Sequence, residues 1–546
     1  MRAWPGLTRR FFGGRGGNVA VIFAIAMMPL MAFTGVAIDY GLITRLQVKL
    51  QAATDATALA LCKTDLGTST ATLQAKAVLM MAEYMAGDKR VAAQPLTVTA
   101  GPPRKISLTT QAGVDALFSS FVGKPQLDTV ATAQCGTPAP KTFEIALVLD
   151  TTGSMKNSGG GTTKIAALQA AASNFVDYIK SSKAFASNSR ISVTPFAVTV
   201  KLDPTAYAAM PWVDSNGLSP SHWTNVDKQQ AAAAGFTSRF SIFSALQKAK
   251  STWGWGGCFE SLAYPLDTQD GAPTSNSTLY VPMFSPDEPG GVGSGSFQQG
   301  STSYDVNNSY LADSNGASGC DAPTDFMAAE KQACKYVAPK VTSSTSIGPN
   351  KQCITQPLQR LTGDSTTLKT LINSLQASGN TNIHEGLIWG WRTLSPISVF
   401  ADGAPYASTT TSKILILMTD GTNAWDLLNS PNKSNYFPGG YLTNADGSSA
   451  LAGFPSSYAS STSTTQLRNA IDQITAETCT NIKASGISVY TIGFSVSSDP
   501  IDKQGISLLQ SCATTSSQAY IANNSTDLMS AFDQIAKSIG SLRLTQ

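Results

Sequence analysis

The chain has 546 residues, enough for two or three domains, and only 13% of them are charged. Its 38 Lys and Arg residues nearly balance 35 Asp and Glu residues without forming a basic stripe, which argues against nucleic acid as a partner. With two histidines, and eight cysteines that form no Cys-x-x-Cys pair, the composition also argues against a zinc site.

An uncharged run from Val19 to Ile38 lies near the N-terminus. Twenty residues in a helix span the roughly 30 Å of a bilayer core. The residues before the run are basic and lack acidic partners: Arg2, Arg9, Arg10 and Arg15. The positive-inside bias therefore predicts a cytoplasmic tail over 1–17, a transmembrane helix over 18–38 and export of the remainder. A cleaved signal peptide is the alternative, but the apolar run is long for one and no good cleavage site follows it.

The next segment, 39–137, is predicted to form a small α+β stem. Apolar residues at helical spacing over 39–61 indicate that the spanning helix continues as one long rod, with a second helix at about 71–86. Alternating residues predict three short strands, at 96–100, 105–110 and 129–133. A Gly- and Pro-rich linker follows at 136–141.

Two segments of this region resemble a known family. The start of the anchor, Gly17-Asn-Val-Ala-Val-Ile, and the stretch Gln51-Ala-Ala-Thr-Asp-Ala-Thr-Ala-Leu-Ala are similar to the N-terminal region of TadG-like Flp/Tad pilus-assembly proteins. The resemblance implies a single-pass protein of the bacterial inner membrane, with its N-terminus in the cytoplasm and its bulk in the periplasm.

Beyond the linker, strand and helix patterns alternate. Strands are predicted at 143–150, 190–198, 413–418 and 489–494, and helices at 163–179, 366–375, 383–392, 465–484 and 526–539. Near-continuous apolar strands between helices are typical of a parallel sheet that is covered on both faces. The predicted fold class is therefore α/β, with a doubly wound, mostly parallel sheet over 143–546.

Oxygen-bearing side chains follow two of these strands and open one helix. Asp150, Thr152 and Ser154 leave the end of the first strand, Thr381 lies in the loop before the helix at 383–392, and Asp420 ends the strand at 413–418. Ligands in open α/β sheets bind outside the carboxyl ends of the strands. Hard divalent cations prefer oxygen ligands, so the five residues form a candidate metal site.

The order D-x-[ST]-x-S, then T, then D resembles the metal-ion-dependent adhesion site of von Willebrand factor A domains, which have a Rossmann-like fold. The resemblance implies that Thr152, Ser154 and Thr381 touch Mg²⁺ or Mn²⁺ directly, and that Asp150 and Asp420 act through water. It also implies one open position that takes a carboxylate from a partner protein. The alternative is an A-type domain whose site is formed but binds no metal.

An insertion of about 201–361 interrupts the alternation. It is rich in Gly, Ser, Asn and Pro, and its segments Trp253-Gly-Trp-Gly-Gly-Cys and Gly348-Pro-Asn-Lys-Gln-Cys resemble insertions in the A domains of TadG-like proteins. We expect it to leave the sheet from the end of an edge strand, where it could line one side of the candidate metal site. The alternative is a disulfide-stapled elaboration without a binding role.

All eight cysteines follow the anchor, as an exported protein with structural disulfides requires. Proximity in sequence suggests that Cys62 pairs with Cys135 and Cys479 with Cys512. The pairing among the central four is left open: Cys258, Cys320, Cys334 and Cys353.

These observations predict a binding protein: a membrane-anchored, periplasm-facing, metal-dependent component of a Flp/Tad-type pilus system. Its partners would be proteins that present an acidic residue, such as pilus-assembly components or pilin. A surface adhesin or matrix-binding module is the alternative. An enzyme is not expected, because Ser154 lacks a G-x-S-x-G context. The pair His384 and Glu385 near Thr381 could suggest a base, but a polar pair on a helix face explains it better.

Overall fold

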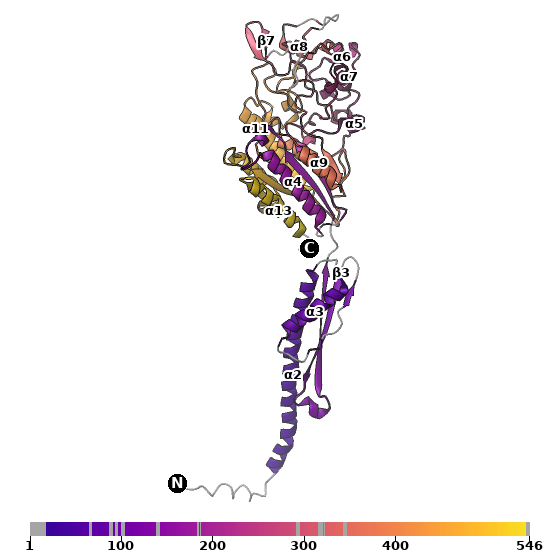
Figure 1. Ribbon diagram of the computed structural model, residues 1–546, viewed down its shortest axis with the longest axis vertical. Coiled ribbons are helices and arrows are strands. Elements are labelled where there is room, and N and C mark those ends of the chain that lie inside the picture. The colour runs from indigo at the N-terminus through magenta and orange to yellow at the C-terminus, as the bar shows by residue number, and fades with distance from the viewer. Residues whose placement is uncertain are drawn as a thin grey trace, which may run out of the picture. The chain divides into compact units, whose positions relative to one another are not determined.

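The computed structural model describes residues 18–64, 68–86, 91–92, 97–99, 104–137, 142–182, 185, 187–290, 295–314, 320, 323–341 and 347–541. The predicted basic tail, 1–17, and most of the predicted linker lie outside these residues. The chain divides into two compact units, 1–139 and 140–546, and each has its own hydrophobic core. Figure 1 shows the elements of both units.

The first unit contains one long helix and an antiparallel sheet. Helix α2, Asn18–Cys62, runs unbroken through the predicted anchor and on into the stem, and α3, Thr70–Tyr84, packs beside it. The sheet has the order β1-β3-β2, with β4 on β3; its strands are β1 Val91–Ala92, β2 Thr97–Thr99, β3 Arg104–Asp115 and β4 Gln126–Thr137. The single rod is confirmed, whereas β3 and β4 are much longer than the predicted strands.

The core of the first unit lies where the second half of α2 meets the sheet. Leu50 and Leu61 of α2 pack with Ile106 of β3 and Ala131 of β4. The predicted disulfide between Cys62 and Cys135 is present and joins the end of α2 to β4. The first half of α2 makes few such contacts. Among the described residues, α2 is the one helix that is long and apolar enough to cross a membrane, which is compatible with a single-pass anchor.

The second unit is built on a mixed six-stranded sheet with the order β12-β11-β10-β5-β6-β9. Neighbouring strands are parallel except for β9, which pairs antiparallel with β6. The strands are β5 Thr142–Asp150, β6 Arg190–Phe196, β9 Gln359–Thr362, β10 Thr411–Thr419, β11 Ser488–Phe494 and β12 Ala519–Ala522. The strands β9 and β12 are short and only partly buried, so no continuous apolar run marks them in the sequence.

Helices cover both faces of this sheet. On one face Leu147 and Leu149 of β5 pack with α4, α9 and α13, and on the other Val148 packs with α10. The helices are α4 Lys164–Ser181, α9 Ser365–Ser374, α10 Ile383–Leu394, α11 Thr464–Ala484, α12 Lys503–Cys512 and α13 Ser525–Ser541. In Figure 1, α4 and α13 lie side by side although they are far apart in sequence. Glycine at 390 allows α10 to approach closely, since a Cβ there would lie 2.4 Å from Cγ2 of Val148.

The insertion between β6 and β9 packs into the same hydrophobic core as α10. Phe259 and Tyr280 of the insertion pack against Trp389 of α10. In the part of the insertion that the structure describes there are four short α-helices and a hairpin: α5 Pro204–Tyr207, α6 Lys228–Ala233, α7 Arg239–Ala249, α8 Phe326–Lys331, β7 Ser296–Gln299 and β8 Thr302–Asp305. The expectation that it leaves from an edge strand is wrong, because β9 pairs with the outer side of β6.

The remaining cysteines form three disulfides in the second unit. Cys479 and Cys512 join α11 to α12, as predicted. The pairing that the sequence left open is Cys258 with Cys353 and Cys320 with Cys334.

Candidate metal centre

Asp150 lies at the carboxyl end of β5 and is fully buried. Its Oδ1 accepts a hydrogen bond from the N–H of Thr152 at 2.7 Å, and its Oδ2 accepts one from Thr419 Oγ1 at 2.5 Å. The carboxylate is therefore held between its own loop and the end of the neighbouring strand β10.

The hydroxyl groups of the same loop extend toward Asp420. Ser154 Oγ donates to Asp420 Oδ1 at 2.7 Å, and Thr152 Oγ1 lies 3.1 Å from Ser154 Oγ. These contacts connect the loop after β5 to the loop after β10. They bring together four of the five residues that the sequence predicts.

Thr381 completes the group from the loop before α10. A Cβ placed on Gly421 would lie 3.3 Å from Thr381 Oγ1 and 3.9 Å from Ser154 Oγ, so both hydroxyl groups face this glycine. The backbone joins the loops as well: Gly153 N–H donates to Gly379 O at 2.8 Å, and Ala424 N–H donates to Thr381 O at 2.9 Å. The structure thus gathers all five predicted residues at one end of the sheet.

Ile354, near the end of the insertion, contacts the loop that carries Thr381. Gly379 has a φ of +80°, and a Cβ there would lie 2.5 Å from Cδ1 of Ile354, the residue after Cys353. The end of the insertion therefore packs directly against the loop that carries Thr381. A side chain at 379 would be strained by its backbone conformation and would displace Ile354.

The electrostatics of the centre suit a cation. Burial and the neighbouring Asp420 raise the pKa of Asp150 to about 7. Burial also raises the pKa of Asp420, and the contacts with Lys164 and Ser154 oppose that rise. A cation would relieve the repulsion between two buried carboxylates. Among the described residues, no cluster of three or more His, Cys, Asp and Glu side chains could hold a metal ion, so a metal at this centre would need hydroxyl oxygens as ligands as well.

Sequence reasoning missed Lys164, the first residue of α4. Its side chain is fully buried, and Nζ donates to Asp420 Oδ2 at 2.8 Å and to Asp499 Oδ2 at 2.7 Å. Asn157 Nδ2 also donates to Asp499, at 2.9 Å. The signal in the sequence is a Lys at the N-terminus of a helix, where the helix dipole disfavours a positive charge unless acidic groups compensate it.

The candidate base pair, His384 and Glu385, contacts residues outside the candidate metal centre. Nε2 of His384 lies 3.1 Å from the carbonyl oxygen of Asp267, and burial lowers the pKa of this histidine to about 3. Glu385 accepts hydrogen bonds from Ser261 and from Nε1 of Trp389. In these contacts neither side chain is directed at Ser154.

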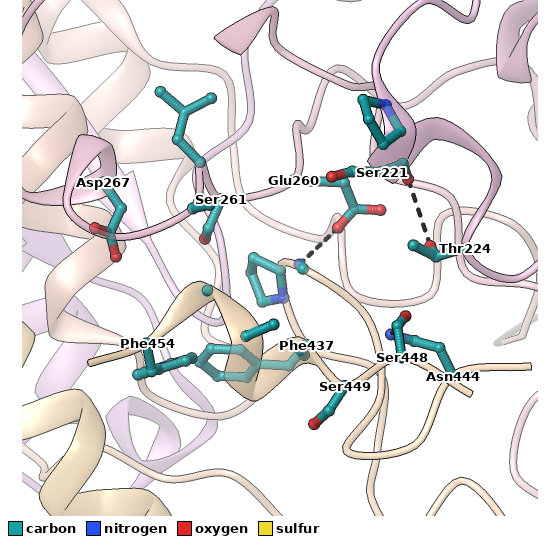
Figure 2. Close-up of a pocket in the computed structure, with 18 of the residues that line it drawn as sticks. Ser221, Thr224, Glu260, Ser261, Asp267, Phe437, Asn444, Ser448, Ser449 and Phe454 are labelled. Atoms are coloured by element: carbon teal, nitrogen blue, oxygen red, sulfur yellow. Dashed lines mark hydrogen bonds between the residues drawn. The ribbon is translucent and has the colours of Figure 1, made fainter. Parts of the chain in front are cut away.

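His384 lines a cavity of about 290 Å³ beside α10. Figure 2 shows its walls: Glu260, Ser261 and Asp267 belong to the insertion, while Phe437 and Phe454 belong to the segment after β10. None of the five candidate metal ligands lines this cavity.

Comparison with known proteins matches the N-terminal segment to a family. Residues 17–60 match the family model described as "Putative Flp pilus-assembly TadE/G-like". No match was found among curated proteins.

Distant similarities to solved structures also exist. The von Willebrand factor domain of the type V pili tip protein Mfa5 from Porphyromonas gingivalis is 11% identical, with 73% of this chain and 96% of that chain covered and a TM-score of 0.32. The pilus adhesin SpaC from Lactobacillus rhamnosus GG is 12% identical, with 83% of this chain and 34% of that chain covered and a TM-score of 0.33. The adhesive tip pilin GBS104 from Group B Streptococcus agalactiae is 12% identical, with 73% of this chain and 100% of that chain covered and a TM-score of 0.33.

The family match covers almost the whole of α2 and contains both segments that resemble TadG-like proteins. The chain thus carries a TadE/G-like Flp pilus-assembly segment at its N-terminus.

Proposed function

We propose that the chain is a membrane-anchored, periplasm-facing binding protein of a Flp/Tad-type pilus system, and that its second unit is a doubly wound von Willebrand factor A-type domain. The observation that carries the proposal is the convergence of Asp150, Thr152, Ser154, Thr381 and Asp420 at the carboxyl end of the sheet. The TadE/G-like segment on α2 supports the pilus context and the anchor.

In this proposal the centre holds Mg²⁺ or Mn²⁺ through the hydroxyls of Thr152, Ser154 and Thr381, with Asp150 and Asp420 supplying negative charge. When bound, the ion supplies an electrophilic position for a carboxylate of a partner protein. The protein's own residues prepare that position: Thr152 N–H and Thr419 orient Asp150, and Lys164 fixes one oxygen of Asp420. Glycine at 421 leaves the space beside the two hydroxyls open. Such an arrangement suits reversible docking of an acidic partner.

Metal binding tests the proposal directly. The full chain in detergent micelles is titrated with Mn²⁺, and the loss of the free-ion electron paramagnetic resonance signal reports binding. We expect one tight site in the wild type and loss of that site in Asp150→Ala and in Thr381→Ala. Metal that binds the folded state also stabilises it, by about 2.7 kcal/mol at a hundredfold excess over Kd.

Asp177→Ala is the matched control, because Asp177 is an exposed carboxylate on α4 that pairs with Lys369 at 2.9 Å, away from the centre. It should bind Mn²⁺ as the wild type does. Equal binding by the wild type and Asp150→Ala would contradict the proposed centre.

A further inference from the structure

The tip of the β3–β4 hairpin, residues 116–125, is attached to α2 near the end of the predicted membrane span. The carboxylate of Asp39 is buried and accepts hydrogen bonds from the N–H groups of Leu117 at 2.9 Å, Phe118 at 3.0 Å and Ser119 at 2.7 Å. It also accepts one from Ser119 Oγ at 2.8 Å. Four donors on one carboxylate fix the hairpin tip to the helix.

A second contact lies one helical turn closer to the N-terminus. A Cβ placed on Gly35 would lie 2.4 Å from Cγ of Phe118, so the Phe118 ring occupies the space that a larger residue would fill. From residue 19 to residue 41 of α2, Gly35 and Asp39 are buried and every other residue is exposed. In this stretch, the two residues that the hairpin tip contacts are therefore the two that are covered.

The contact fixes the depth of the hairpin tip relative to the apolar run. Gly35 lies three residues before Ile38, the last residue of the run, which corresponds to about 4.5 Å along the helix axis. The Phe118 ring therefore lies at the level of the last turn of the predicted span.

The hairpin tip exposes large apolar side chains at that level. Leu117 is 58% exposed and Phe118 is 42% exposed. No charged residue occurs between Asp115 and Lys124. Exposed apolar side chains are favourable at a membrane interface, where aromatic residues also gather.

We propose that the hairpin tip inserts Leu117 and Phe118 into the interfacial layer of the same bilayer that α2 spans, on the side where the stem emerges. The proposal rests on the membrane anchor of the proposed function. The occupant of this apolar surface is lipid, because the helix beside it is exposed and apolar on all other sides up to Ile38. Two points of contact with the bilayer would restrain the tilt of the stem.

Nitroxide labels on single introduced cysteines test the proposal in the full chain. All eight native cysteines are in disulfides, so an introduced cysteine is the one reactive thiol. Labels are placed at Phe118→Cys and at Leu117→Cys, the latter keeping the contact between Phe118 and Gly35. The chain is reconstituted into phosphatidylethanolamine and phosphatidylglycerol vesicles, and collision rates with oxygen and with a water-soluble nickel chelate report depth.

Two control positions on α2 bracket the expected result. Phe33→Cys lies inside the apolar run, and Leu59→Cys lies on the same helix 21 residues beyond Ile38, about 31 Å further along the axis. Both native side chains are exposed, at 76% and 58%. We expect the labels at 117 and 118 to favour oxygen collisions at least tenfold over the label at 59.

The outcomes separate the two proposals. Labels at 117 and 118 that behave like the label at 59, while the label at 33 is protected from the nickel chelate, would overturn insertion of the hairpin tip and leave the anchor intact. A label at 33 that is open to the nickel chelate would overturn the anchor and the insertion together.

Discussion

At the scale of single residues, the candidate centre combines two buried carboxylates with one buried ammonium group. Lys164 contacts Asp420 at 2.8 Å and Asp499 at 2.7 Å, and its side chain is fully buried. A buried ion pair adds little net stability, but removal of one partner leaves the other charge unpaired. Lys164 therefore orients Asp420 and opposes the rise in the pKa of its carboxyl that burial causes.

Lys164→Met is expected to lower the free energy of unfolding of the second unit by about 3–5 kcal/mol without metal. Added Mg²⁺ should recover part of that loss, because the ion would compensate the carboxylates. Urea unfolding with a chelator and with Mg²⁺ measures both effects. The matched control is Lys369→Met, whose exposed pair with Asp177 contributes about 1 kcal/mol or less. Equal losses in the two variants would show that Lys164 is not a structural part of the centre.

Glu330, in α8 of the insertion, predicts a pH dependence of stability. Burial raises the pKa of this carboxyl to about 8, and nearby Glu288 adds to the rise, while a hydrogen bond from Asn432 and the charge of Lys335 oppose it. A raised pKa means that the folded state holds the proton more tightly than the unfolded state. The stabilisation is therefore complete below about pH 4.5 and is lost as the pH rises to about 8.

Glu330→Gln should remove this contribution to the pH dependence, because glutamine keeps a carbonyl for Asn432 and does not ionise. The slope of unfolding free energy against pH should become less negative by up to about 1.4 kcal/mol per pH unit between pH 5 and pH 8. Urea unfolding in chelator at several pH values measures it. An unchanged slope would mean that Glu330 titrates normally in the folded protein.

At the scale of elements, the insertion supports the loop that carries Thr381. Ile354 packs against Gly379, and the adjacent Cys353 is joined to Cys258 across 95 residues. The disulfide between Cys320 and Cys334 closes only 14 residues and lies elsewhere in the insertion. The two bridges therefore have the same chemistry and differ in their relation to the candidate centre.

The double variant Cys258→Ala with Cys353→Ala should lose about 4–5 kcal/mol of unfolding free energy, against about 3 kcal/mol for Cys320→Ala with Cys334→Ala. Only the first should weaken Mn²⁺ binding, because only the first frees the segment that supports the Thr381 loop. Urea unfolding and the Mn²⁺ titration measure the two effects. Similar Mn²⁺ affinities in both double variants would show that the insertion does not support the centre.

At the scale of the whole molecule, the chain consists of two units with separate cores. Every disulfide lies within one unit: Cys62 with Cys135 in the first, and three in the second, including Cys479 with Cys512. Separate cores predict separate cooperative transitions, since cooperativity arises from contacts within a core.

Calorimetry of the full chain in micelles should therefore show two transitions. Cys62→Ala with Cys135→Ala should lower the melting temperature of one transition, and Cys479→Ala with Cys512→Ala should lower that of the other. Each double variant serves as the control for its counterpart. A single transition that both variants lower equally would show that the units unfold as one body.

Much of this organisation could be predicted from neighbouring residues. The apolar run at 19–38 and the alternation of strands and helices after residue 142 depend on local periodicity. The meeting of the five oxygen-bearing residues from Asp150 to Asp420 depends on the common edge where parallel strands end. Proximity in sequence also predicted two of the four disulfides. Such patterns can be read from a sequence because the side chains of a helix or strand repeat at a fixed spacing along the chain.

Tertiary structure alone decided the rest. Lys164 meets Asp420 and Asp499 across 256 and 335 residues, and Asp39 meets the hairpin tip across about eighty. No periodicity relates such residues, because their distance depends on how the sheet orders its strands and on how the hairpin folds back on α2. The strand β9, which pairs with β6 after the whole insertion, escaped prediction for the same reason. The five residues of the candidate centre could thus be named from the sequence. The groups that orient them and balance their charge, such as Lys164, are brought there by contacts that only the folded chain creates.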